Sequence, residues 1–189
     1  MDNGSTYYYK VAAVNSSGTG TLSSVASALL SADIQGSQTY NAHTYAMTSS
    51  AMSFADAKAA AAALGGYLTT VNTKAENTFL TNEFYAAYGN KALWIGANDI
   101  ATENTWVWDN GTTSGDSGVT DNICGNGCNP KSLAEWPDGT KKWNWSGNGE
   151  PNNSGNAPIG EDCANITRSD GTWNDLNCAN DQYGIIEID

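Results

Sequence analysis

Helical patterns in this chain are confined to one early region, which narrows the folds that the chain can adopt. Ser53 is followed three residues later by Asp56, a spacing that caps a helix N-terminus. The alanine-rich run over residues 55–64 favours helix, and Gly65-Gly66 ends it. A second capping pair and a periodic apolar face come next, formed by Thr73 and Glu76 and by Leu80, Phe84 and Tyr88. The sequence therefore predicts two helices that lie close together along the chain.

The remainder of the chain has the pattern of short strands and loops. Strand-like pieces occur among Trp, Gly and Asn residues, at residues 67–71, 93–96, 105–108 and 183–188. Two helices and a loop-rich β region predict an α+β domain, which we expect to span residues 38–189. Residues 111–142 are polar and aperiodic, so we interpret them as an insertion that Cys124 and Cys128 staple.

Residues 1–31 have a different pattern from the rest of the chain. Tyr7, Tyr9, Val11 and Ala13 alternate with other residues, a turn-like segment occupies 15–20, and a weak second strand lies near residues 22–28. This segment resembles the C-terminal hairpin of a fibronectin type III domain. Two strands do not form that sandwich alone, so either the domain is truncated or the hairpin packs on the α+β domain. The resemblance implies a longer, modular, extracellular protein.

The charge balance excludes some classes of partner. The chain has 8 Lys and Arg residues against 20 Asp and Glu residues and a net charge of −12. Nucleic acids and anionic membranes require a basic surface, so we expect neither as a partner. No apolar run reaches the ~18 residues that cross a bilayer, so we expect no membrane insertion. The acidity is compatible with bound divalent cations, and also with a role in solubility alone.

Oxygen ligands are concentrated near the C-terminus. Three carboxylates and two amides occur within 26 residues, at Glu150, Asn152, Glu161, Asn174 and Asp175. Ca²⁺ prefers 6–8 oxygen ligands in a flexible cage. An Asn side chain can give its carbonyl oxygen to the metal and still donate through its N–H groups. Acceptor carboxylates and donor amides around one metal suit a vicinal diol, so the sequence predicts calcium-dependent sugar binding.

The four cysteines favour disulfides over a metal site. An even number of cysteines fits two disulfides and an oxidising compartment. The rival interpretation is a zinc site of four cysteines, but the paired knuckles of such sites are absent. The single histidine, His43, cannot form a multi-histidine zinc site and has no nucleophile motif nearby, so we interpret it as a surface or half-buried side chain.

From Tyr40 onward, about 150 residues resemble a C-type lectin-like domain. The motifs that carry the resemblance occur in the family's order: Gly65-Gly66-Tyr67-Leu68, Trp94-Ile95-Gly96, Trp106-Val107-Trp108, Glu150-Pro151-Asn152, Glu161-Asp162-Cys163 and Gly171-Thr172-Trp173-Asn174-Asp175. The resemblance implies the C-type lectin fold, with two helices, small antiparallel sheets and a long calcium-binding loop region. It also implies that Trp173 packs beneath that loop region.

The resemblance assigns calcium ligands to particular positions. It implies that the principal Ca²⁺ is held by Glu150, Asn152, Glu161, Asn174 and Asp175, and that Pro151 follows a cis peptide bond. The order Glu-Pro-Asn is associated with mannose-type sugars, namely mannose, fucose and glucose. A second Ca²⁺ would use Asp99, Glu103, Asp162 and Asn153, although Asp99 and Glu103 could equally be two solvated acids.

The family's disulfides are only partly represented here. The resemblance implies a disulfide between Cys163 and Cys178, which would close a loop around Asn174 and Asp175. The family's long disulfide, from the first helix to the last strand, lacks both partners in this chain. Alanines occupy the helix and Ile185-Ile186 the strand, so we expect apolar packing in its place.

Three classes of function remain open from the sequence. The first is a calcium-dependent lectin module of an extracellular, adhesin-like and bacterial protein that binds glycans. The second is a module that recognises a protein or a cell surface through the 111–142 insertion, because one fold can serve several functions. The third is a glycosidase that uses Glu150 and Glu161, but metal ligation among asparagines would make them poor acids and bases, so we expect no enzyme activity.

Overall fold

The structure is a computed structural model that describes most of the chain outside the 111–142 insertion. The described residues are 6–10, 12, 14–16, 18–21, 26–29, 34–109, 144–146, 149–154 and 160–189. The chain divides into two compact units, Met1–Ile34 and Gln35–Asp189. Cys124 and Cys128, which we expected to staple the insertion, lie outside the described residues.

The first unit contains short paired strands. Strand β1 (Thr6–Tyr9) pairs antiparallel with β4 (Ala26–Leu29), and β2 (Val14–Asn15) pairs antiparallel with β3 (Gly18–Thr19). The alternation predicted from Tyr7 and Tyr9 therefore falls in a strand. The second strand lies at 26–29, slightly later than the stretch near residues 22–28 that the sequence indicated.

The two predicted helices are present in the second unit, and side chains cap both of them. Helix α1 (Phe54–Ala63) starts where Ser53 Oγ accepts a hydrogen bond from the Asp56 N–H at 3.2 Å. Helix α2 (Lys74–Leu80) starts where Thr73 Oγ1 accepts from the Glu76 N–H at 3.0 Å. Each cap satisfies a backbone donor that has no partner within the helix.

Helix α2 continues directly into a π-helix, η1 (Thr81–Ala86), which the sequence did not indicate. The widened turn is seen where the Ala87 N–H donates to the carbonyl of Asn82, five residues earlier, at 3.3 Å. Leu80 and Phe84 are fully buried and Tyr88 packs against them, so the apolar face predicted from their spacing is the buried one.

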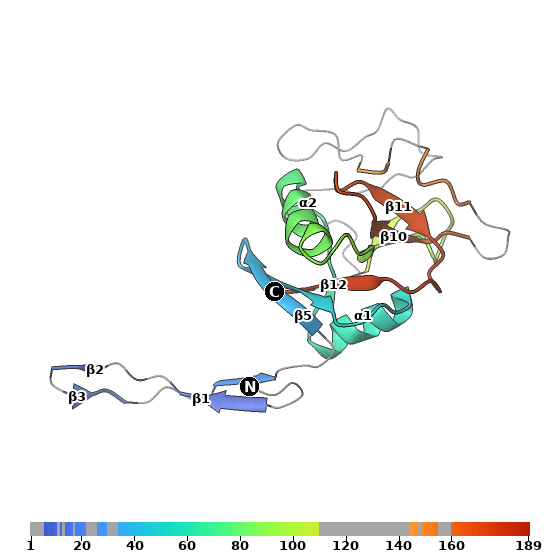
Figure 1. Ribbon diagram of the computed structural model, residues 1–189. Coiled ribbons are helices and arrows are strands. Elements are labelled where there is room, and N and C mark those ends of the chain that lie inside the picture. Colours follow the sequence, from blue (N-terminus) through green and yellow to red (C-terminus); the bar gives the residue numbers. More distant parts are fainter. Residues whose placement is uncertain are drawn as a thin grey trace. The chain divides into compact units, whose positions relative to one another are not determined.

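Eight strands form one sheet in the second unit (Figure 1). They are β5 (Ile34–Tyr40), β6 (His43–Thr48), β7 (Tyr67–Leu68), β8 (Leu93–Asn98), β9 (Val107–Trp108), β10 (Cys163–Ile166), β11 (Trp173–Leu176) and β12 (Tyr183–Ile188). The main path runs β11-β10-β8-β12-β6-β5, with β7 paired to β12 and β9 paired to β8. Strand β12 runs antiparallel to β6 but parallel to β8, so the sheet is mixed rather than wholly antiparallel.

The two helices cover opposite faces of this sheet, with α1 and α2 on either side of β12 in Figure 1. On the α1 face, Phe54, Ala57, Leu68, Trp94 and Cys163 form a small buried cluster. The larger cluster on the other face contains Leu80 and Phe84. A Cβ atom added to Gly184 would lie 2.9 Å from the Ala57 side chain, so helix and strand pack closely at this point. The sequence predicted apolar packing between the first helix and the last strand in place of the family's long disulfide. Helix α1 and strand β12 pack against each other at this place.

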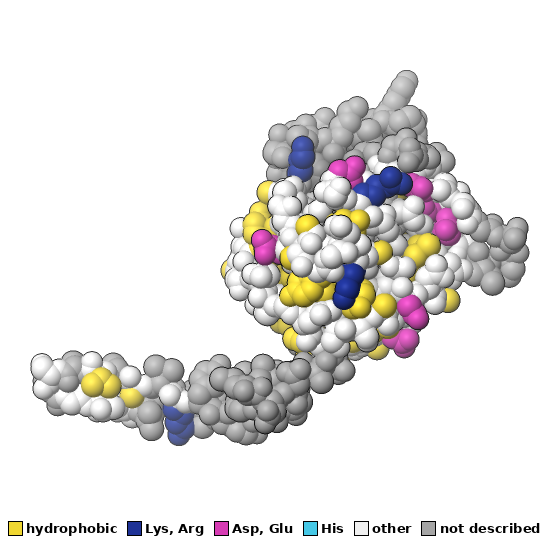
Figure 2. Space-filling view, in the orientation of Figure 1, with side chains coloured by type: hydrophobic (Ala, Val, Ile, Leu, Met, Phe, Trp, Pro, Cys, Tyr) yellow, Lys and Arg dark blue, Asp and Glu magenta, His cyan; other side chains and the backbone are white. Residues whose placement is uncertain are grey.

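Basic side chains are few on the described surface. On the face shown in Figure 2, the Lys and Arg side chains of the described residues are scattered rather than gathered into one patch. Among the helices in the described part of the chain, none is long and apolar enough to cross a membrane.

Candidate calcium and ligand site

Strand β11 and two loops bring the predicted principal ligands toward one another. Asn174 and Asp175 lie on β11, opposite Asn165 and Ala164 of β10 in an antiparallel register. Glu161 lies just before β10 begins at Cys163, and residues 150–154 approach from the loop that precedes it. The sheet therefore fixes one half of the ligand set, and the loops supply the other half.

The Asp175 carboxylate is the centre of this arrangement. Its side chain is only 1% exposed. Oδ1 accepts a hydrogen bond from the Asn152 N–H at 3.1 Å, and Oδ2 accepts from the Asn153 N–H at 2.7 Å. Charge-assisted hydrogen bonds of this kind are stronger than neutral ones. Asp175 thus holds the loop backbone of residues 152 and 153 against strand β11.

Direct contacts link the other predicted ligands. The Glu150–Pro151 peptide bond is cis, as the resemblance implied. The Asn152 side-chain amide donates to Glu150 Oε2, and the Asn174 amide donates to the backbone carbonyl of Asp175. Each amide therefore uses one of its two N–H donors in these contacts.

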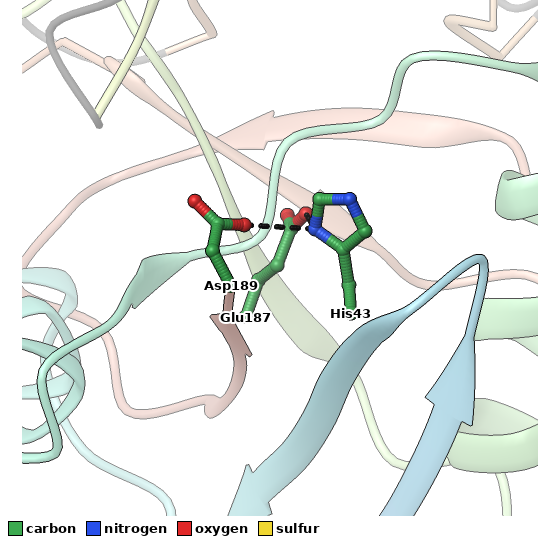
Figure 3. Close-up of side chains that lie close together, drawn as sticks. All are labelled: His43, Glu187 and Asp189. Carbon is green, nitrogen blue, oxygen red and sulfur yellow. Dashed lines mark ion pairs between the residues drawn. The ribbon is translucent and has the colours of Figure 1, made fainter.

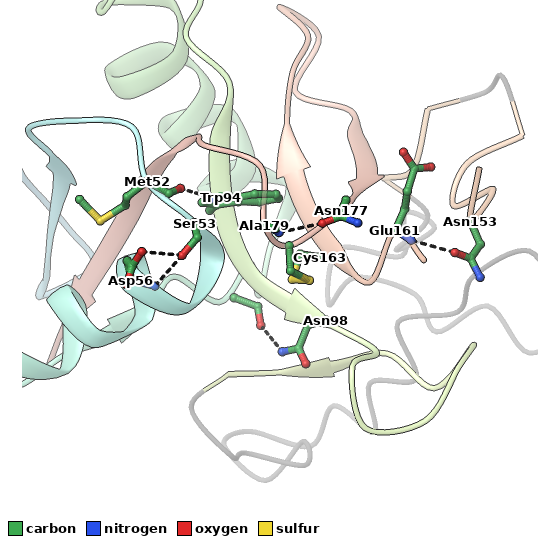
Figure 4. The surroundings of a disulfide bond; sticks show 12 residues. Met52, Ser53, Asp56, Trp94, Asn98, Asn153, Glu161, Cys163, Asn177 and Ala179 are labelled. Carbon is green, nitrogen blue, oxygen red and sulfur yellow. Dashed lines mark hydrogen bonds between the residues drawn. A yellow bond between two sulfur atoms is a disulfide. The ribbon is translucent and has the colours of Figure 1, made fainter. Parts of the chain in front are cut away.

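Glu161 joins the two loop segments. The Ser154 N–H donates to Glu161 Oε2 at 2.8 Å. In return, the Glu161 N–H donates to Asn153 Oδ1, also at 2.8 Å (Figure 4). These reciprocal hydrogen bonds bring Glu161 to the same loop as Glu150 and Asn152, so the structure brings all five predicted principal ligands into one region.

The electrostatics of this region favour a bound cation. Burial, then the neighbouring Asp175 and then Glu161, raise the pKa of Glu150 to about 7, while the charge of Arg168 lowers it. Burial and the charge of Asp175 also raise the pKa of Glu161. In the described part of the chain, none of these three carboxylates forms an ion pair with Lys or Arg. Carboxylates that crowd one another in this way are stabilised by a divalent cation, and an all-oxygen set fits Ca²⁺.

The predicted second calcium set lies partly next to the first. Asp99 is 4% exposed, so the interpretation of it as a solvated acid is wrong. Its Oδ2 accepts from the Asn104 N–H at 2.8 Å, while Oδ1 is buried without a hydrogen-bond partner. Burial, followed by the charges of Glu103, Asp162 and Asp175, raises the pKa of Asp99 to about 6 even though the Asn104 hydrogen bond opposes this. An unpartnered buried carboxylate oxygen fits a cation ligand.

The remaining members of the second set differ in their surroundings. The Asp99 N–H donates to the Asp162 carbonyl at 3.0 Å, which joins these two residues through the backbone. The Asn153 and Asp162 side chains both approach Gly160, where an added Cβ would lie 2.6 Å from each Oδ1. Glu103 is exposed. The structure therefore brings Asp99, Asp162 and Asn153 to one edge of the site, with Glu103 at the surface.

Buried tryptophans pack around Trp173, which precedes Asn174 and Asp175 on strand β11. Trp173 is 2% exposed, and its ring lies 5.8 Å from that of Trp145 and 5.9 Å from that of Trp108. Its indole N–H donates to Asn77 Oδ1 at 2.9 Å. The Ser146 N–H donates to the Trp173 carbonyl at 2.9 Å. Trp173 is therefore a core residue, as the resemblance implied, and Trp145 is buried against it.

A disulfide braces the strands that carry Asn174 and Asp175. Cys163 and Cys178 are bonded, with a sequence separation of 15 and 5.2 Å between their Cα atoms (Figure 4). The pairing that the resemblance implied is thus present, and these two cysteines are not ligands of a four-cysteine zinc site. The bond encloses β11 and both of its predicted calcium ligands.

The structure also brings together a cluster that sequence reasoning missed. His43, Glu187 and Asp189 meet at the ends of β6 and β12, away from the loops described above (Figure 3). His43 precedes Glu187 by 144 positions, so only the pairing of these strands reveals the contact. No local spacing in the sequence could have found it.

Comparison with known proteins identifies the family to which this fold belongs. Residues 50–186 match the family described as the Lectin C-type domain. The chain is 28% identical over 146 residues to C-type lectin domain family 4 member M of Symphalangus syndactylus, covering 77% of this chain and 27% of that protein. It is 32% identical over 139 residues to CD209 antigen-like protein D of Mus musculus, covering 74% of this chain and 45% of that protein. The carbohydrate-recognition domain of the mouse scavenger receptor C-type lectin superposes with a TM-score of 0.58 at 24% identity, covering 81% and 95% of the two chains.

The chain belongs to the C-type lectin domain family. Its α+β architecture, with two helices and a mixed sheet, is the C-type lectin fold, and the family is one of binding modules rather than enzymes. The chain spans only 26–30% of the length of the relatives named C-type lectin domain family 4 member M. The functions of those larger proteins are therefore not assigned to this chain.

Proposed function

We propose that residues 38–189 form a calcium-dependent carbohydrate-binding module that recognises mannose-type sugars. The observation that carries the proposal is that Glu150, Glu161 and Asp175 lie around the same loop backbone, where Asp175 and Glu161 accept hydrogen bonds from residues 152–154. Burial, and then the charges of the neighbouring carboxylates, raise the pKa values of both glutamates. Such a group is stable at neutral pH when a cation neutralises it. The five-residue set supplies three carboxylates and two amide oxygens for Ca²⁺.

The side chains around the metal have complementary roles toward a sugar. When bound, Ca²⁺ supplies coordination to two neighbouring hydroxyl oxygens. Glu150 and Glu161 accept the hydroxyl protons, and the amides of Asn152 and Asn174 donate to the hydroxyl lone pairs. The Glu-Pro-Asn order, which the family resemblance links to mannose-type sugars, fixes which side accepts and which side donates. One shallow site buries little surface, so useful avidity requires several copies.

Three features of the chain support a wider setting. The Cys163–Cys178 disulfide fits an oxidising, extracellular environment. The strands in residues 1–31 support a fibronectin type III-like neighbour, and we propose a modular, bacterial, adhesin-like protein as the parent. The auxiliary set of Asp99, Glu103, Asp162 and Asn153 is proposed to hold a second Ca²⁺, chiefly because of the unpartnered Asp99 oxygen.

Calorimetric titration with mannose, fucose and galactose tests the proposal. We expect mannose and fucose to bind in calcium, and binding to vanish with chelator and in Glu150→Ala. Asp181→Asn is the matched control, because Asp181 is an exposed carboxylate outside the site and its removal should leave binding unchanged. Sugar binding that survives both chelation and Glu150→Ala would refute the proposed role of calcium.

Recognition of a protein or surface is the second candidate. It is favoured by the length of the segment between β9, which ends at Trp108, and β10, which starts at Cys163. A long excursion beside a binding site is often functional. Deletion of residues 113–140 separates the candidates, because a chelator-insensitive partner lost on deletion supports recognition by this segment, whereas retained sugar binding supports the lectin site.

A further inference from the structure

A second cluster of ligand-type side chains lies at the paired ends of strands β6 and β12. His43 begins β6, Glu187 lies opposite Tyr45 in the antiparallel register, and Asp189 follows the end of β12. His43 Nδ1 lies 3.0 Å from Glu187 Oε1 and 2.8 Å from Asp189 Oδ1 (Figure 3). One ligand atom from each of the three residues falls within 4.8 Å of the other two.

The fold holds Glu187 in one orientation. Its side chain is 1% exposed, and Oε2 accepts three hydrogen bonds: from the Thr70 N–H at 3.0 Å, from the Thr69 hydroxyl at 3.1 Å and from the Thr70 hydroxyl at 3.2 Å. These donors occupy Oε2 and direct Oε1 toward His43, with only a long contact of 3.4 Å from the Tyr45 hydroxyl to Oε1. Carboxylates that ligate metals are commonly oriented by such hydrogen bonds.

Asp189 is oriented too, but it remains open to solvent. The Tyr67 hydroxyl donates to Asp189 Oδ1 at 2.9 Å. The His43 and Asp189 side chains are 40% and 65% exposed. An ion could therefore reach the cluster from solvent, with the buried Glu187 at its base.

The imidazole contacts are not aligned as hydrogen bonds. Both carboxylate oxygens are within 3.0 Å of Nδ1, yet this buried atom forms no hydrogen bond with either. A ring N–H points in the plane of the ring and can be directed at one acceptor at a time. A cation placed between the nitrogen and the two oxygens would satisfy all three atoms at once.

We propose that His43 Nδ1, Glu187 Oε1 and Asp189 Oδ1 bind one Zn²⁺, at a site separate from the calcium loops. Zinc accepts imidazole nitrogen and carboxylate oxygen at ~2.0–2.2 Å and is often held by three protein ligands and a water. Ligand atoms at those distances from a tetrahedral centre lie ~3.4 Å apart. The observed separations of 2.8 Å and 3.0 Å need only a small expansion to match.

The ligand types distinguish this site from the calcium region. Calcium prefers oxygen ligands alone, whereas imidazole suits zinc and the neighbouring transition metals. The same chain therefore presents an oxygen-only set on its loops and a nitrogen-containing set at the end of its sheet. Zinc binding here rests on no step of the proposed sugar-binding function.

Zinc titration of the tag-free 189-residue protein, in excess calcium, tests the inference. Because His43 is the single histidine, nitrogen-15 NMR of imidazole reports one ring. We expect one equivalent of Zn²⁺ to bind and to shift the Nδ1 resonance. His43→Gln and Asp189→Asn should each weaken zinc binding by at least about tenfold, while Asp181→Asn retains it.

Several results would overturn the inference. An Nδ1 resonance that does not move with zinc would show that the cluster is only an ion pair between a protonated imidazole and two carboxylates. Equal zinc affinity in His43→Gln, Asp189→Asn and the wild-type protein would place any bound zinc elsewhere. The exposed positions His43 and Asp189 are chosen because Glu187→Gln would disturb three buried donors and could unfold the protein. Loss of sugar binding with zinc binding intact would affect the lectin proposal alone.

Discussion

Buried carboxylates occur in two regions of this domain, and the protein treats them differently. Glu76 accepts hydrogen bonds from the Tyr45 hydroxyl and the Asn72 N–H, each at 2.7 Å. In the loop region, burial and then the neighbouring Asp175 and Glu161 raise the pKa of Glu150. Hydrogen-bond donors face the Glu76 carboxylate, which belongs to the framework. In the loop region, carboxylates lie near one another, and we propose that a cation neutralises them.

The largest effect should come from Asp175→Asn. The substitution removes a charge from the proposed calcium set and weakens the acceptor for two backbone N–H groups. We expect calcium affinity to fall by at least roughly 10–100-fold, and sugar binding to be lost with it. Calcium titration followed by calorimetry measures both, with Asp181→Asn as the control. A calcium affinity within about twofold of wild type would contradict the assignment of Asp175 to the proposed calcium site.

The next effect should come from removing the disulfide in a Cys163→Ala, Cys178→Ala double variant. Loss of a link that spans 15 positions should destabilise the domain by ~3 kcal/mol in the entropic treatment of the unfolded chain. Urea unfolding monitored by circular dichroism measures the change. Calcium affinity should also fall, because the bond encloses Asn174 and Asp175. Unchanged stability would show that the strand pairing of β10 and β11 suffices without the link.

Glu76→Gln should destabilise the framework by about 1–3 kcal/mol, because it weakens the acceptor for Tyr45 and Asn72 in a buried site. We expect the loss in free energy of unfolding to be the same in calcium and in chelator, since Glu76 belongs to the framework region. Parallel urea unfolding in the two conditions provides the measurement. A loss seen only in chelator would mean that the two regions are coupled.

The smallest effect should be a pH dependence confined to the loop region. In the metal-free protein, the raised pKa of Glu150, about 7, means that its contribution to stability is present below the unfolded value and lost as pH rises through 7. Calcium competes with that proton, so calcium affinity should fall as pH decreases from about 8 to about 5. Calcium titration across this range, with proton release measured in two buffers, checks the sign. A constant affinity would argue against proton competition at Glu150.

Local features of the fold could be predicted, and features set by strand pairing could not. The caps at Ser53 and Thr73 involve partners three residues away, so the sequence displayed them directly. The π-helix after Leu80 has no comparable local signal. The parallel pairing of β12 with β8 joins residues about 90 positions apart, which no short pattern encodes.

The same limit applied to the sites. The five proposed calcium ligands occur within 26 residues, so their composition alone indicated a shared site. That Asp175 would bind the backbone of residues 152 and 153, and that Asp99 would be buried, required the structure. His43 and Glu187 are brought together by the register of β6 and β12, and composition gives no signal for such a contact.

Strand β8 fixes both ends of the segment that connects β9 to β10. Its end pairs with β9 through Val107 and with β10 through Cys163, so the chain leaves one edge of β8 and returns on the other. The departure and return points are therefore fixed about two strand spacings, or ~10 Å, apart. Doubling the length of a loop closed between fixed ends costs only about 0.6 kcal/mol. The connection between β9 and β10 can therefore change in length without altering the sheet, provided that Trp145 and the proposed calcium ligands Glu150 and Glu161 are kept.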